Sequence, residues 1–223
     1  MLTLTHVLLV LTLASLAVLG VYALVFFIAL VLSFRAEKVS DAAIDRGREK
    51  GLPVDVLVPA HNEGKGLINC LESLVHQKYA GPITVKVLLK DFQDTAVPLL
   101  EKKFDLAFGQ GAVRPKMLGN VTIEILATGQ GPKRDRLNQV IPSLTSVYTA
   151  ILDADHVADT GWIRGSVAKL EQDQTAHAVQ AIRRPLSLSN LFQMWDSAQN
   201  HIGNELLNKL YRIFGQSTFF TGT

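Results

Sequence analysis

Two acidic residues, Asp153 and Asp155, directly follow the apolar run VYTAIL at 147–152. At the end of a strand, side chains at positions i and i+2 point to the same side, so the two carboxylates are expected to lie together. Neighbouring carboxylates repel, and a divalent cation that relieves this repulsion keeps positions for phosphate oxygens. The pattern therefore indicates binding of a metal and a diphosphate, with a solvated acidic turn as the alternative. We expect His156 to support this turn rather than to bind the ion.

Two other segments carry polar groups in places suited to a ligand. The apolar run VDVLVP at 54–59 is followed by AHNEG at 60–64. Lys133 opens a helix-compatible stretch, KRDRLN at 133–138. A cation at a helix N-terminus opposes the helix dipole, and it fits better beside an anion such as phosphate. The alternative for Lys133, Arg134 and Arg136 is an exposed basic cluster.

Several classes of protein are excluded or disfavoured. The formal net charge of +2 in 223 residues is too small to indicate nucleic acid as a partner. A single cysteine, Cys70, excludes a disulfide scaffold and a cysteine-rich zinc site, and predicts a small buried side chain. The sequence lacks the G-x-G-x-x-G fingerprint, a P-loop, H-E-x-x-H and G-x-S-x-G, which disfavours dinucleotide-binding, P-loop, metalloprotease and hydrolase sites.

The elements that must position these residues alternate along the chain. Apolar runs rich in β-branched residues predict strands at 54–59, 83–89, 121–126, 147–152 and 177–182. Helical spacing predicts helices at 67–75, 95–108, 133–141 and 161–170. Such alternation is typical of an α/β fold with a mostly parallel sheet and flanking helices. Ligands bind beyond the carboxyl ends of parallel strands, where the polar segments lie.

The first 34 residues contain no Asp, Glu, Lys or Arg, and residues 7–34 are almost continuously apolar. This length is sufficient to cross a bilayer, whereas a signal peptide has a basic start and a shorter apolar run. A buried helix of a soluble domain is the other alternative. Basic residues follow the segment at Arg35, Lys38, Arg46, Arg48 and Lys50. The positive-inside rule therefore predicts a single-pass protein of the inner (plasma) membrane with its soluble domain in the cytoplasm.

We divide the chain into four parts. These are a transmembrane helix at 1–34, a juxtamembrane linker at 35–53, an α/β domain at 54–186, and a C-terminal segment at 187–223. Apolar residues at helical spacing from Leu188 to Leu210 predict an amphipathic helix in the last part. It packs on the sheet or lies at the membrane interface, and the sequence favours neither.

Four motifs, in order over residues 54–223, resemble those of the family 2 glycosyltransferases. They are VPAHNE at 58–63 for V-P-x-x-N-E, Lys133 with Leu137 and Asn138 for K-x-x-x-L-N, LDADH at 152–156 for D-x-D, and FTGT at 220–223 for F-x-G-T. The membrane-anchored branch that includes cellulose-synthase-like and hyaluronan-synthase-like enzymes is the most similar. The resemblance implies a GT-A fold, a nucleotide-diphosphate sugar such as a UDP-sugar, and Mg²⁺ or Mn²⁺.

The resemblance also implies roles for individual residues. Asp155 is expected to bind the metal and the diphosphate, and Asp153 to lie near the ribose or the metal. The other donor-binding residues that it implies are Ala60, His61, Glu63, Asp91 and Lys133. The family's D-D-x-S element is replaced here by KDFQD at 90–94, where Asp91 best matches the residue that contacts the base.

No catalytic base is identified in this sequence. The family places an E-D acid and Q-x-x-R-W beyond the G-T segment, and the chain contains neither Glu-Asp nor Arg-Trp. Thr221 and Gly222 would begin the acceptor region, so we expect the base beyond Thr223 and interpret the chain as the donor-binding portion of a C-terminally truncated, inverting enzyme. Its acceptor would be a polysaccharide or a lipid. The alternatives are a non-catalytic membrane-anchored interaction subunit and a polyprenyl-phosphate sugar transferase.

Overall fold

The computed structural model describes residues 3–33, 50–108, 113–181 and 183–203. The chain divides into two compact units, one of residues 39–179 and one that combines residues 1–38 with 180–223. Thr221 and Gly222 lie outside the described residues, as do Arg35, Lys38, Arg46 and Arg48 of the predicted linker.

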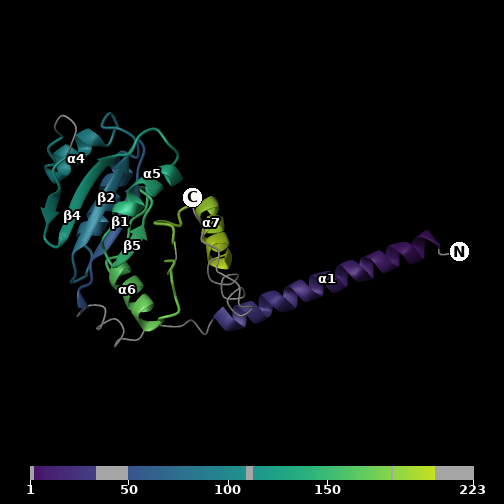
Figure 1. The fold of residues 1–223 in the computed structure, drawn as a ribbon. Coiled ribbons are helices and arrows are strands. Elements are labelled where there is room, and N and C mark those ends of the chain that lie inside the picture. Colours follow the sequence, from purple (N-terminus) through teal and green to yellow (C-terminus); the bar gives the residue numbers. More distant parts are fainter. Residues whose placement is uncertain (1–2, 34–49, 109–112, 182, 204–223) are drawn as a thin grey trace. The chain divides into compact units, whose positions relative to one another are not determined.

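The larger unit is built on a five-stranded sheet with the order β3-β4-β2-β1-β5. Figure 1 shows its four longer strands side by side. The parallel strands are β1 (Val54–Pro59), β2 (Ile83–Leu89), β4 (Val121–Ala127) and β5 (Tyr148–Ile151). In register, Val54 pairs with both Ile83 and Tyr148. Four of the predicted strands are thus confirmed, and their carboxyl ends meet at one edge of the sheet.

Two features of the sheet differ from the prediction. The edge strand β3 (Lys116–Leu118) pairs antiparallel with β4 and was not expected, because its three residues are too few to show alternation. The predicted strand at 177–182 is wrong, since none of the described residues 177–181 is in a strand. A strand needs a neighbour for its backbone hydrogen bonds, and β-branched composition does not supply one.

One face of the sheet is covered by α3 (Lys65–Val75), α4 (Val97–Phe104) and α6 (Trp162–Gln172). The buried residues of α3 are Leu67, Cys70, Leu71 and Leu74, whose spacing places them on one helix face. The predicted burial of Cys70 is confirmed. The helix predicted at 95–108 ends earlier, at Phe104, because Asp105 adopts a left-handed conformation with φ 52° that stops it.

The other face carries a smaller core. Leu57 of β1 and Leu88 of β2 pack there with Val140, the last residue of α5 (Lys133–Val140). The short 3₁₀ helix η1 (Ile141–Ser143) follows α5 directly. The helix α5 begins at Lys133, as predicted, and its last residue, Val140, is buried in this smaller core.

The other unit contains α1 (Leu4–Ser33) and α7 (Leu191–His201). The stretch Leu4–Ile28 of α1 has a mean hydropathy of 2.5 and is a candidate transmembrane span. Two of its hydroxyl groups are satisfied within the helix, since Thr12 and Ser15 each donate to the carbonyl four residues earlier. In α7, the cap residue Asn190 accepts a hydrogen bond from the backbone N–H of Gln193, at 2.9 Å. The amphipathic helix predicted from Leu188 to Leu210 is present over 191–201, and the part of that prediction from residue 204 onward lies outside the described residues.

Candidate functional site

The turn that follows β5 brings two carboxylates and an imidazole together. The potential ligand atoms of Asp153, Asp155 and His156 all lie within 4.8 Å of one another. His156 Nδ1 is 3.5 Å from Asp153 Oδ2 and 3.7 Å from Asp155 Oδ1. The turn is closed by a hydrogen bond of 3.0 Å from the backbone N–H of His156 to the carbonyl of Asp153. The structure thus confirms that the two carboxylates lie close together, and it adds His156 to the cluster.

The exposure of the three side chains differs. The Asp155 side chain is 69% exposed, whereas that of Asp153 is 20% exposed and forms an ion pair with Lys133 at the start of α5. Carboxylates are suitable ligands for Mn²⁺ or Mg²⁺, the imidazole suits a softer divalent ion than Mg²⁺, and few protein ligands leave positions for phosphate oxygens. The donor set therefore fits a divalent cation. The expected supporting role of His156 stays a prediction, and its ring nitrogen lies close enough to both carboxylates to join the donor set.

Cys70, a buried residue of α3, contacts this turn. Its thiol lies 3.7 Å from the carbonyl oxygen of Asp153. Burial, reinforced by the negative charges of Asp155 and Asp153, raises the pKa of the Cys70 thiol to about 12. The thiol is therefore protonated at neutral pH and is not a nucleophile. At Gly66, a Cβ atom would lie 3.6 Å from the Cα atom of Asp155, so the first turn of α3 also approaches the cluster closely.

The segment that follows β1 holds three of the predicted donor-binding residues. Ala60 is buried, and its backbone N–H donates to the carbonyl of Leu88 at 3.0 Å. The side chain of His61 is 47% exposed, and Glu63 is also exposed. Between them, Asn62 adopts φ 57°, a left-handed conformation that asparagine tolerates better than most residues. The segment therefore turns sharply and presents polar side chains to solvent.

The segment that follows β2 contains an important residue that the sequence did not single out. Asp94 is buried, and its carboxylate accepts hydrogen bonds from the backbone N–H groups of Asn62, at 2.8 Å, and Ala96, at 2.9 Å. It thereby ties the segments after β1 and β2 together. Asp91, the predicted base-contacting residue, is half-buried and accepts hydrogen bonds from the Gln93 backbone and the Gln130 side chain.

Arg136 also differs from expectation. The basic cluster at the start of α5 was expected to be exposed if it had no role, yet Arg136 is only 5% exposed. Burial lowers the pKa of its guanidinium, and the negative charge of Asp94 opposes that effect. By contrast, the Arg134 side chain is 84% exposed and pairs with its neighbour Asp135. Helical spacing predicts that one face of α5 is buried, but it does not predict that the guanidinium of Arg136 lies on that face.

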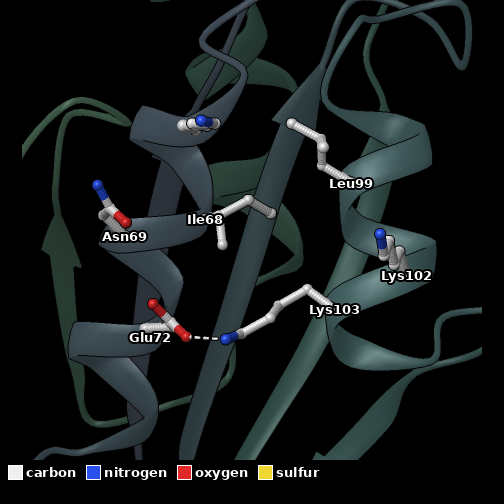
Figure 2. A pocket seen from close by; sticks show the side chains of 7 residues that line it. Ile68, Asn69, Glu72, Leu99, Lys102 and Lys103 are labelled. Carbon is white, nitrogen blue, oxygen red and sulfur yellow. Dashed lines mark ion pairs between the residues drawn. The ribbon is translucent and has the colours of Figure 1, made fainter.

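A hollow of about 410 Å³ lies apart from this cluster, between α3 and α4 (Figure 2). The Glu72–Lys103 ion pair crosses it. Its lining residues are Lys65, Ile68, Asn69, Glu72, Leu99, Lys102 and Lys103. None of these is a predicted donor-binding residue, and the hollow lacks an acidic pair. The candidate site is therefore the carboxyl edge of the sheet.

The sequence from 55 to 220 matches the family described as Glycosyl transferase family 2. The chain belongs to this family. The resemblance to family 2 and the GT-A-type α/β fold expected from the motifs are therefore confirmed, and the matched region includes most of the larger unit and part of the other. No protein of curated function shows significant sequence similarity to the chain.

Two solved structures illustrate the likeness in fold. The mannosyltransferase PcManGT from Pyrobaculum calidifontis, in complex with GDP-Man and Mn²⁺, is 20% identical, with a TM-score of 0.47 over 75% of this chain and 46% of that chain. S. aureus TarS 1–349 in complex with UDP-GlcNAc is 18% identical, with a TM-score of 0.42 over 59% of this chain and 38% of that chain. This chain therefore spans less than half the length of either solved chain.

Proposed function

We propose that this chain is the donor-binding portion of a metal-dependent, inverting glycosyltransferase that uses a nucleotide-diphosphate sugar. The main support is the cluster of Asp153, Asp155 and His156, with Lys133 beside it, at the carboxyl edge of a family 2 domain. An acidic cluster next to a lysine at a helix N-terminus suits a ligand that carries both a cation and a diphosphate.

In this proposal Asp155 and Asp153, with His156, hold Mg²⁺ or Mn²⁺. When bound, such an ion offsets the negative charge that develops on the leaving diphosphate. Lys133 has two roles, because it pairs with Asp153 in the absence of donor and lies within reach of a phosphate at the start of α5. The high exposure of Asp155 leaves its outer side open to the donor.

The nucleoside part of the donor would bind along the segments after β1 and β2. Ala60, His61 and Glu63 form one side of this proposed surface, and Asp91 forms the other. The hydrogen bonds of Asp94 to both segments support this role, since they hold the two sides in a fixed relation before the donor arrives.

The remaining predictions concern the complete protein. We propose a membrane-anchored enzyme of the cellulose-synthase-like and hyaluronan-synthase-like branch, with the catalytic domain on the cytoplasmic side of the inner membrane and α1 as its anchor. The acceptor would be a polysaccharide or a lipid. Thr221 and Gly222 would lie in the acceptor region, and a carboxylate of the complete enzyme would take the proton of the acceptor hydroxyl.

Calorimetric titration tests the donor site directly. UDP-GlcNAc and GDP-Man are titrated into the full chain with Mn²⁺, with Mg²⁺ and with EDTA. We expect metal-dependent binding that Asp155→Asn weakens about 100-fold, because that change removes a charged ligand. Asp105→Asn is the matched control, since Asp105 is an exposed aspartate that follows α4.

Equal affinity in the Asp155→Asn variant and the unaltered chain would contradict the metal role. Absence of binding under every metal condition would contradict donor binding, and would favour the non-catalytic interaction subunit instead.

A further inference from the structure

Arg136 of α5 joins the ends of the two central strands. Its Nη1 atom donates to the carbonyl of Ala60 at 2.8 Å and to the carbonyl of Leu88 at 2.9 Å. The carbonyl of Leu88 also accepts the backbone N–H of Ala60. The guanidinium therefore connects α5 to the exact region where the first two strands leave the sheet.

A buried arginine is a costly way to pack a helix on a sheet. Arg136 is 5% exposed, and its Nε atom is buried with no hydrogen-bond partner among the described residues. Apolar side chains of similar volume often stabilise such a position more than a buried charge does. The charge that acts on Arg136 is that of Asp94, which itself holds the segments after β1 and β2. Packing alone does not account for this arginine.

Arg136 lies on the same side of α5 as Lys133, the residue proposed to contact the donor diphosphate. Residues three apart on a helix lie on the same side, and Arg136 is three residues after Lys133. Lys133 reaches Asp153 from the first turn of α5. Any rotation or slide of α5 would move Lys133 relative to the carboxylates, and Arg136 connects this helix to strand ends whose position is fixed by the sheet.

We propose that Arg136 is a positioning residue for donor binding, which acts by fixing α5 so that Lys133 stands beside Asp153. This inference rests on the proposed function, because it assumes that Lys133 meets the donor diphosphate. Arg136 itself need not touch the donor.

The test compares donor affinity in four variants of the full chain, with UDP-GlcNAc and GDP-Man as probes in the presence of Mn²⁺. Arg136→Met keeps much of the side-chain volume and removes the hydrogen bonds. Arg136→Lys keeps a donor for the carbonyls. Arg134→Met is the matched control, since Arg134 is exposed on the same helix. Val167→Ala is a destabilising control, because Val167 is a buried residue of α6 that is not one of the predicted site residues.

We expect Arg136→Met to weaken donor binding about tenfold, since small misplacements of a positioned group have effects of this size. Arg136→Lys keeps one donor group and should bind the sugar donor about threefold more weakly than the unaltered chain, between the unaltered chain and Arg136→Met. Arg134→Met and Val167→Ala should bind the donor like the unaltered chain, even where Val167→Ala lowers the melting temperature as much as Arg136→Met does. If Arg136→Met does not fold, the test depends on Arg136→Lys. A loss of donor affinity of about threefold in Arg136→Lys supports the proposal, and an unchanged donor affinity in that variant contradicts it.

A double-mutant cycle with Lys133→Met shows whether Arg136 acts through Lys133. If it does, the double variant binds the donor no more weakly than Lys133→Met alone. Fully additive losses, or an Arg136→Met variant with normal affinity, would overturn the proposal while leaving the proposed function intact. Failure of the unaltered chain to bind either probe, or equal binding by Asp155→Asn, would instead overturn the proposed function, and this inference with it.

Discussion

The two sides of the candidate site are built differently. After β1 and β2, the chain is held by buried hydrogen bonds in which Asp94 accepts two backbone N–H groups and Arg136 donates to two carbonyls. After β5, the turn carries the carboxylates of Asp153 and Asp155 close together, and the second of these is mostly exposed. The first side is complete without a ligand, whereas the second concentrates negative charge.

The segments after β1 and β2 therefore form a preformed surface, whereas the turn after β5 forms a surface that a ligand would complete. Buried polar groups with satisfied hydrogen bonds fix the shape of a segment before binding. Carboxylates held near each other repel, so such a cluster gives up stability in exchange for affinity for a cation, although the ion pair of Lys133 with Asp153 offsets part of the repulsion here. We therefore expect substitution of Asp94 to affect mainly folding, and substitution of Asp153 or Asp155 to affect mainly binding.

The largest effect is expected at Asp94. Asp94→Ala leaves the backbone N–H groups of Asn62 and Ala96 without their acceptor, and should lower the free energy of unfolding by about 3 kcal/mol. Asp91→Ala, on the same segment but half-buried, should cost less than about 1 kcal/mol. Urea unfolding of both variants checks this. Equal losses would mean that the first side is not held by Asp94.

The next effect is stabilisation by ligand. At a concentration 100 times the dissociation constant, a nucleotide sugar with Mn²⁺ should raise the free energy of unfolding by about 2.7 kcal/mol. Asp153→Asn should lose most of this gain, since it removes a carboxylate of the cluster. Thermal unfolding with and without ligand measures it. An undiminished gain in Asp153→Asn would show that the ligand binds elsewhere.

The pH dependence of stability tests the environment of Cys70, whose thiol contacts the turn after β5. Because the pKa of Cys70 rises from 9.0 to about 12 on folding, the unfolded thiol loses its proton first as the pH increases. Stability is therefore unaffected by this group below pH 9 and falls between pH 9 and 12, with a slope of at most about 1.4 kcal/mol per pH unit. Cys70→Ala should be less sensitive over that range in urea unfolding. The same slope in both proteins would refute the prediction.

The smallest expected effect is a change in the free energy of unfolding that has opposite signs for Asp155→Asn and Asp94→Asn. Asp155→Asn removes one of two neighbouring negative charges, and should raise the free energy of unfolding of the ligand-free protein by about 0.5 kcal/mol. Asp94→Asn replaces a carboxylate that accepts two backbone hydrogen bonds, and should lower it. Urea unfolding at pH 8 compares them. A loss of stability in Asp155→Asn would mean that its carboxylate supports the fold.

Local patterns in the sequence determined most of the elements and half of the site. Runs of β-branched residues predicted β1 and β2 to the residue, and the position of Asp153 and Asp155 after an apolar run predicted their proximity. The strands were predicted correctly because composition and periodicity decide where a strand forms. The two carboxylates lie close together because a turn follows β5, a geometry that strand alternation does not describe.

Only the tertiary structure decided the role of the residues that connect these elements. Asp94 and Arg136 resemble surface residues in sequence, and become buried because segments distant along the chain close over them. The missing strand at 177–181 shows the same limit, since a strand depends on a partner that its own residues do not specify. Local propensity determines which elements form, whereas burial and hydrogen-bond partners depend on contacts between distant segments.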